Sequence, residues 1–116
     1  MSAPPDASAT IRVGSLEVRP AELVAAVDGH ALELTVRELQ LLTALARRHD
    51  RIVSREELYT AVWRRPFRRN ERSVDVYVKR LRRKLPGSVL IHTHYGFGYR
   101  LSSSVSQLFH TSATAR

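Results

Sequence analysis

The chain has 116 residues, enough for one compact domain with short tails but with little room for a second domain. Hydrophobic residues make up 43% of it and charged residues 26%, which argues against global disorder, and the absence of cysteine excludes disulfides and thiolate metal sites. With a formal net charge of +8, no secretory signal pattern and no apolar run of membrane-spanning length, the sequence indicates a soluble cytoplasmic protein that does not enter a membrane.

Residues 1–10 come first and are rich in alanine, proline and serine, so we interpret them as a flexible lead or linker. From residue 11 to residue 34, apolar and polar residues follow a strand-like pattern, and Asp28-Gly29 is typical of a tight hairpin turn. The apolar runs cover residues 16–18, 23–27 and 32–34. This region therefore predicts a small antiparallel sheet.

Two helices are predicted next, each by a capping box in which a hydroxyl and a carboxylate satisfy free backbone N–H groups. Residues 35–38 (TVRE) form the first box, and apolar residues at helical spacing extend this helix over 36–48. Residues 54–57 (SREE) form the second box, which starts another helix. The proline within residues 64–70 ends that helix in a loop.

A third helix is predicted for residues 71–85, because their apolar positions recur at intervals of four, three and four. The stripe that faces the core comprises Val74, Val78, Leu81 and Leu85. The opposite side comprises Arg72, Val76, Lys79, Arg80 and Arg83. Pro86-Gly87 ends the helix, and two short strands over 89–93 and 99–102 close the domain as a hairpin.

The basic charge is concentrated around this third helix. Residues 64–84 hold ten lysine or arginine residues and two acids, whereas the rest of the chain holds nine of each. A charge run is usually a solvated face, but such faces tend to mix signs, and residues 76–85 contain no acid. We therefore expect this basic segment to bind a polyanion, and we favour nucleic acid over an anionic membrane. A helix fits the DNA major groove, where lysine and arginine bond guanine edges or phosphates and Val76 could contact a thymine methyl group.

Other chemistries find little support. His92 and His94 lie on one face of a strand, as zinc ligands can, but no carboxylate or cysteine lies nearby in sequence to complete a site. Gly96 and Gly98 belong to a tight turn, since neither a phosphate-binding glycine loop nor a nucleophile motif is present. We expect no metal, no cofactor and no enzymatic activity.

Four stretches in this order carry a family resemblance: LELTVRELQLL, IVSREELYTAVW, RSVDVYVKRLRRKL and IHTHYGFGYRL. Over residues 11–102 the chain resembles the OmpR/PhoB-type winged-helix effector domain of bacterial response regulators, the output proteins of two-component systems. The resemblance implies an α+β winged helix-turn-helix fold with a small N-terminal antiparallel sheet, three helices and a C-terminal β-hairpin wing. It implies a transcriptional regulator that binds double-stranded DNA sequence-specifically. Recognition helix 71–85 would lie in the major groove, and wing 89–102 on the adjacent backbone or minor groove.

The resemblance also implies which side chains contact DNA. Lys79 and Arg80 match positions that reach base edges or nearby phosphates. Val76 matches an apolar base-contacting position, and Arg72 and Arg83 match phosphate-binding positions. Trp63 matches a position near the DNA backbone, with capping of the core as an equal alternative. Ser73 matches either a phosphate contact or a local role at the helix start, and Thr93 matches a backbone-contacting residue of the wing.

Three features depart from the family pattern. Tyr95, preceded by His94, stands at the wing tip where relatives often have an arginine that enters the minor groove, so here a tyrosine stacks on sugar or packs instead. The loop after Trp63 is unusually basic; in relatives it can contact RNA polymerase, and here Arg68 and Arg69 could grip phosphates instead. No receiver domain is present, so we interpret the chain as a stand-alone regulator or, in preference, as a fragment whose first residues are a former linker.

Further partners and alternatives remain open. Relatives bind tandem half-sites, which implies a dimer on DNA. The alternative functions are a protein-interaction winged helix that binds an acidic partner, and a nonspecific nucleoid or RNA binder. In the tail, 103–116, apolar residues at helical spacing predict a short amphipathic turn that packs on the domain, contacts a partner or stays disordered.

Overall fold

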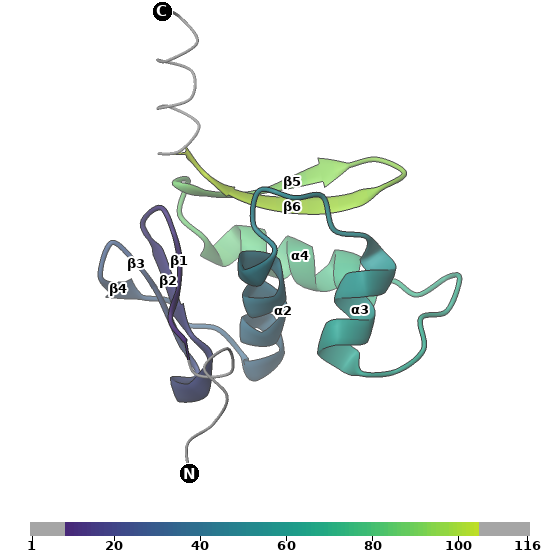
Figure 1. Ribbon diagram of the computed structural model, residues 1–116, viewed down its shortest axis with the longest axis horizontal. Helices are drawn as coiled ribbons and strands as arrows, with labels where there is room; N and C mark the ends of the chain where they lie inside the picture. Colours follow the sequence, from purple (N-terminus) through teal and green to yellow (C-terminus); the bar gives the residue numbers. More distant parts are fainter. Residues whose placement is uncertain (1–8, 105–116) are drawn as a thin grey trace, which may run out of the picture.

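The computed structural model describes residues 9–104 and begins with a four-stranded antiparallel sheet in the order β1-β2-β3-β4 (Figure 1). The strands are β1 (Ile11–Val13), β2 (Leu16–Arg19), β3 (Val24–Val27) and β4 (His30–Ala31), and a short 3-10 helix, η1 (Pro20–Glu22), joins β2 to β3. The hairpin turn predicted at Asp28-Gly29 is confirmed, since Val27 pairs with His30 across it. The strand pattern predicted for residues 32–34 is wrong: β4 ends at Ala31, and Leu32 and Leu34 follow it as partly buried residues outside any strand.

Three helices follow in the described part of the chain: α2 (Val36–Arg47), α3 (Arg55–Trp63) and α4 (Ser73–Lys84). In Figure 1, α2 stands between the sheet and α3, and α4 runs behind them. Every layer supplies fully buried leucines to one core: Leu16 from β2; Leu41, Leu42 and Leu45 from α2; Leu58 from α3; Leu81 from α4; Leu101 from the terminal hairpin. No helix among residues 9–104 is long and apolar enough to cross a bilayer.

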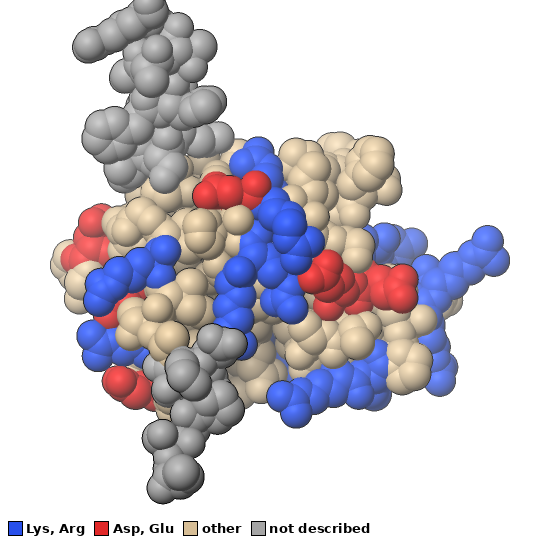
Figure 2. All heavy atoms as spheres, in the orientation of Figure 1, with Lys and Arg blue, Asp and Glu red and all other residues tan. Residues whose placement is uncertain are grey.

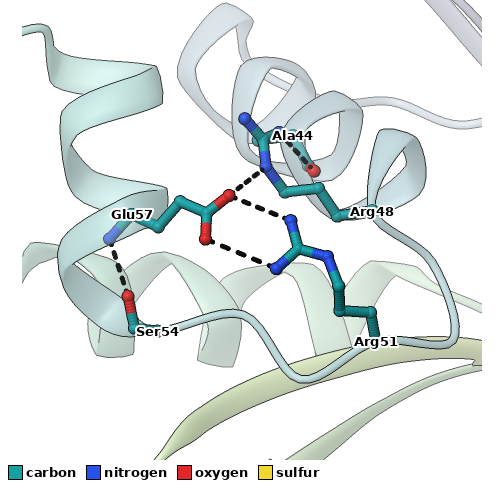
Figure 3. A network of polar contacts seen from close by, with 5 residues as sticks. All are labelled: Ala44, Arg48, Arg51, Ser54 and Glu57. Carbon is teal, nitrogen blue, oxygen red and sulfur yellow. Dashed lines mark hydrogen bonds and ion pairs between the residues drawn. The ribbon is translucent and has the colours of Figure 1, made fainter.

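The first capping box is confirmed, because the Thr35 hydroxyl accepts from the Glu38 N–H and the Glu38 carboxylate accepts from the Thr35 N–H. The second is only half formed. The Ser54 hydroxyl accepts from the Glu57 N–H at 3.0 Å, but the Glu57 carboxylate is bound by Arg48 Nε at 2.8 Å and Arg51 Nη2 at 3.0 Å (Figure 3).

Glu57 therefore ties the end of α2 to the start of α3 instead of closing its own box. Hydrogen bonds from Arg51 and Arg48 hold the pKa of the Glu57 carboxyl below its ordinary value. Arg48 also donates to the Ala44 carbonyl, which satisfies one of the free carbonyls at the end of α2 (Figure 3).

The chain ends, within its described part, in a hairpin of β5 (Val89–His94) and β6 (Gly98–Ser103). Val53, between α2 and α3, forms an antiparallel bridge with Tyr99 through two backbone hydrogen bonds of 2.8 and 2.9 Å. The hairpin thus joins the body of the domain at the start of its second strand, close to the turn. Apart from Ser103 and Ser104, the predicted amphipathic turn of the tail lies outside the described residues.

An ion pair between an exposed lysine and a buried carboxylate joins α4 to α2. The Glu38 side chain is 3% exposed, and Lys84 Nζ donates to it at 2.7 Å. Burial alone would raise the pKa of Glu38, but hydrogen bonds from Lys84 and Thr35 outweigh it and lower that pKa.

We expect Lys84→Met to destabilise the domain by about 1–3 kcal/mol at neutral pH, because it leaves a buried carboxylate without its counter-ion. Since the folded pKa of Glu38 is lowered, the stabilisation is fully present above the usual glutamate pKa of 4.5 and is lost as pH falls through the folded value. Urea unfolding at several pH values measures this, with Lys79→Met on the same helix as the control. An equal loss at neutral and strongly acidic pH would contradict the assignment.

Candidate nucleic-acid interface

Helix α4 has the two-sided character that the sequence predicted. Val74, Val78 and Leu81 are at most 1% exposed and pack into the core, while Leu85 is partly buried at the helix end. All five residues predicted on the opposite side are exposed: Arg72, Val76, Lys79, Arg80 and Arg83. The apolar stripe therefore anchors the helix and leaves its basic side open to a partner.

Arg80 is partly oriented before any partner binds. Its guanidinium lies 4.7 Å from the centre of the Tyr77 ring, a cation–π distance. Tyr77 in turn meets the edge of Trp63, with ring centres 5.5 Å apart. This contact restricts the rotamers of a side chain that points outward, which lowers the entropy lost on binding.

Trp63 belongs to an aromatic cluster at the end of α3. It stacks on Tyr59 with ring centres 5.1 Å apart, and the Arg37 guanidinium lies 5.2 Å from its ring centre. The ring is partly buried and packs against the core. This placement agrees with the core-capping alternative, while a DNA contact for Trp63 stays a prediction.

Arg82, which the sequence interpretation did not single out, clasps the hairpin to α4. Its guanidinium donates to the Ile91 carbonyl from Nε at 3.1 Å and from Nη2 at 2.6 Å, and Nη2 also donates to Thr93 Oγ1 at 2.7 Å. The Thr93 hydroxyl accepts that bond and keeps its own proton to donate to a phosphate. Arg82 therefore fixes the predicted wing contact relative to the helix.

A second link between α4 and the hairpin runs through Asp75. The Tyr99 hydroxyl donates to one carboxylate oxygen at 2.5 Å, and Arg55 Nη2 donates to the other at 2.6 Å. Burial, then the bond to Asp75, raises the pKa of Tyr99 to about 12. Arg55 Nη2 also reaches the Glu71 carbonyl, but Arg55 Nε is buried without a hydrogen-bond partner among the described residues.

Ser73 takes the local role. Its hydroxyl donates to the Glu71 carboxylate at 2.5 Å, and this bond is the main cause that lowers the pKa of Glu71. The phosphate contact considered for Ser73 would require that bond to be exchanged.

A groove of about 460 Å³ separates the start of α4 from the turn of the hairpin. It brings together four of the predicted contact residues: Arg72, Thr93, His94 and Tyr95. His94 accepts from Arg100 at 3.1 Å, whereas Tyr95 is 88% exposed. Arg68 and Arg69 are exposed in the loop before α4 and do not line the groove.

Basic side chains also occur elsewhere. Figure 2 shows them over the end of α2 and the loop that follows it, where acidic side chains lie among them. There Arg48 and Arg51 share Glu57. The outward side of α4 differs because residues 76–85 contain no acid. Charge sign, rather than the number of arginines, distinguishes the candidate interface.

Sequence reasoning missed Arg55, Asp75, Arg82 and Tyr99. One signal existed for Asp75: it is one of only two acids in the basic segment 64–84, at a position where it can pair. For Arg82 the helical period placed the residue between the two sides of α4, which gave no indication of the hairpin carbonyl that it binds.

Three packed helices, a sheet before them and a braced hairpin after the basic third helix together make this a winged helix-turn-helix domain. A family model for the C-terminal part of transcriptional regulatory proteins matches residues 29–101. The chain belongs to this family, the OmpR/PhoB-type C-terminal domains of response regulators, as its resemblance indicated.

Relatives and solved structures agree. The transcriptional regulatory protein PrrA of Mycobacterium tuberculosis is 41% identical over 97 residues, 81% of this chain and 42% of PrrA. The heme response regulator HssR of Staphylococcus aureus is 32% identical over 103 residues, 86% of this chain and 46% of HssR. This chain therefore spans less than half the length of these curated relatives.

Two solved structures are similar over most of their length. The DNA-binding domain of CpxR from E. coli superposes with a TM-score of 0.75 at 36% identity and covers 83% of this chain and 98% of its own. The DNA-binding domain of RstA from Klebsiella pneumoniae, solved in complex with the RstA box, has a TM-score of 0.74 at 28% identity and covers 81% and 97%.

Proposed function

We propose that this domain is the output domain of a transcriptional regulator and binds double-stranded DNA in a sequence-specific manner. Helix α4 enters the major groove, and the wing β5–β6 lies on the adjacent backbone or minor groove. The observation that carries the proposal is the outward side of α4, which is exposed, basic and free of acids while its opposite stripe is buried. The similarity to a domain solved with its DNA box supports it.

The positions along α4 suggest a division of roles. Arg72 and Arg83 lie near the two ends of the helix. A helix that lies in the major groove brings its ends close to the two DNA backbones, so we assign these arginines to phosphates. Lys79, Arg80 and Val76 lie between them and are assigned to base edges and a thymine methyl group. Thr93, Arg68 and Arg69 add backbone contacts from the wing and the loop.

Further partners are proposed on the strength of the family. The loop 64–70 is exposed over most of its length and precedes the interface, which suits a contact with RNA polymerase. Tandem half-sites would bring a second copy onto the same duplex as a dimer. A function of this kind places the protein in the cytoplasm, on the nucleoid.

Selection of bound duplexes from a random pool tests the function, followed by gel shifts of the recovered site at several salt concentrations. We expect one recovered motif and competition by random DNA only at large excess. Equal competition by random DNA would favour a nonspecific binder, and the absence of a shift would favour the protein-interaction alternative.

Arg80→Ala and Arg72→Ala should separate base from phosphate contacts. We expect Arg80→Ala to cost about 1–3 kcal/mol on the recovered site and to relax preference at one base position. Arg72→Ala should weaken all sequences alike and reduce the salt slope by about one. Titrations against the site and its single-base variants measure both effects. Arg12→Ala, an exposed arginine on β1, is the control; an unchanged profile for Arg80→Ala would contradict its role.

A further inference from the structure

The turn of the wing exposes two aromatic rings. Tyr95 is 88% exposed and Phe97 is 73% exposed, the largest fractions among the exposed large hydrophobic residues. Gly96 lies between them with φ +83°, and the Phe97 N–H donates to the His94 carbonyl at 2.9 Å, which closes the turn. Neighbouring exposed apolar side chains of this size mark a contact surface.

The strand residues on both sides of this turn are held in place by contacts with the rest of the domain. Arg82 binds two groups of β5, Asp75 binds the Tyr99 hydroxyl, and Val53 pairs with the Tyr99 backbone. The three links attach the hairpin to α4 and to the α2–α3 connection. The rings are therefore held away from the core on a braced support, so a partner pays little entropy to meet them there.

The chemistry around the rings favours DNA as that partner. Between Thr93 and Tyr99 the turn contains no lysine or arginine, so the tip itself is apolar. Arg72 lines the groove behind it, beside the ion pair that Arg55 forms with Asp75, and Arg100 lies beside it through its bond to His94. An apolar tip flanked by cations complements a minor groove, in which stacked bases lie between two rows of phosphates.

We propose that Tyr95 and Phe97 form an aromatic wedge that enters the minor groove beside the α4 site, contacts a base step and bends the duplex toward the major groove. The inference rests on the proposed function and adds to it a deformation of the DNA. Apolar side chains inserted from the minor groove partly unstack a step and bend DNA by about 20–90°. Flexible pyrimidine–purine steps cost least to open, so the wedge would add preference at a position where no hydrogen bond reads the base.

The experiment uses the duplex recovered by selection, labelled at its ends with a donor and an acceptor dye and carrying 2-aminopurine at successive positions next to the α4 site. The wild-type chain should shorten the end-to-end distance and raise 2-aminopurine fluorescence at one step. The double variant Tyr95→Ser with Phe97→Ser should abolish both signals and weaken binding about tenfold, since stacking on bases is lost.

Tyr95→Arg combined with Phe97→Ser is the matched variant, because it supplies a cation to the minor groove without an aromatic ring. It should retain more affinity than the double serine variant but restore neither signal. Both side chains are exposed, so the variants should unfold at the wild-type temperature, which circular dichroism verifies.

The possible failures are distinguishable. Bound DNA that stays straight and stacked with the wild-type chain contradicts the wedge, whatever its sequence, and so do signals that persist in the double serine variant. A wild-type chain that bends DNA without sequence preference contradicts the proposed function and leaves the wedge supported. No binding to any duplex contradicts both, and binding of the rings to a protein would then have to explain their exposure.

Discussion

Replacement of Gly98 by alanine should destabilise the domain by about 3 kcal/mol, a large effect for the addition of one methyl group. A Cβ at this position would overlap the Val53 carbonyl oxygen, which is part of the backbone and cannot turn aside. The backbone of Gly98 also has φ +149°, which residues other than glycine rarely adopt. Alanine would therefore push the hairpin away from the Val53–Tyr99 bridge.

Gly96→Ala is the matched control for that substitution. Gly96 also has a positive φ of +83°, but a Cβ there would meet no atom within 4 Å from elsewhere in the described part of the chain. This substitution should cost only about 1–2 kcal/mol, the strain of a left-handed conformation. Urea unfolding of the two variants measures the difference. Equal losses would mean that backbone strain, and not the contact with Val53, makes glycine necessary at position 98.

Asp75→Ala should destabilise the domain by about 2–3 kcal/mol, because it removes the acceptor of both Arg55 and the Tyr99 hydroxyl. Arg55 already has one buried nitrogen without a described partner, so the loss leaves this guanidinium poorly compensated. Helix α4 also loses the acid of its first turn, which interacts favourably with the helix dipole. Asp75→Asn keeps an acceptor for Tyr99 and should cost less.

The titration of Tyr99 gives an independent reading of the same variant. The pKa of Tyr99 is raised to about 12, so the stability that it contributes is fully present below the usual tyrosine pKa of 10.0 and is lost as pH rises through about 12. In Asp75→Ala this pKa should fall, although burial keeps part of the shift. Ultraviolet titration of tyrosinate follows it. An unchanged titration would show that Asp75 does not hold the Tyr99 hydroxyl in solution.

The helices could be predicted because their signals are local. Thr35 and Glu38 lie one turn apart, and the stripe Val74, Val78 and Leu81 follows the helical period, so neither depends on distant parts of the chain. The second box shows the limit of such a signal. Glu57 has the right position to cap the helix, but its carboxylate accepts hydrogen bonds from Arg48 and Arg51 instead of from the Ser54 N–H.

The strand boundaries and the contacts that hold the hairpin to α4 could not be predicted, because they depend on residues far apart in the sequence. Leu32 and Leu34 alternate as strand residues do, yet alternation reports which side chains face the core, not which backbones pair. The hydrogen bonds that Arg55 and Tyr99 donate to Asp75 join residues 20 and 24 positions apart. Residue type alone does not select such partners, so the exposed side of α4 could be predicted and its supports could not.

The hydrogen bonds from Arg82 to β5 have a consequence for which DNA shapes the domain would bind. One guanidinium binds both the Ile91 carbonyl and the Thr93 hydroxyl, so it links the position of the wing to that of helix α4. Under the proposed function, a duplex whose neighbouring grooves do not match this arrangement would have to twist or bend to meet both the helix and the wing. Operators would then be ranked by their compliance as well as by the bases that they display.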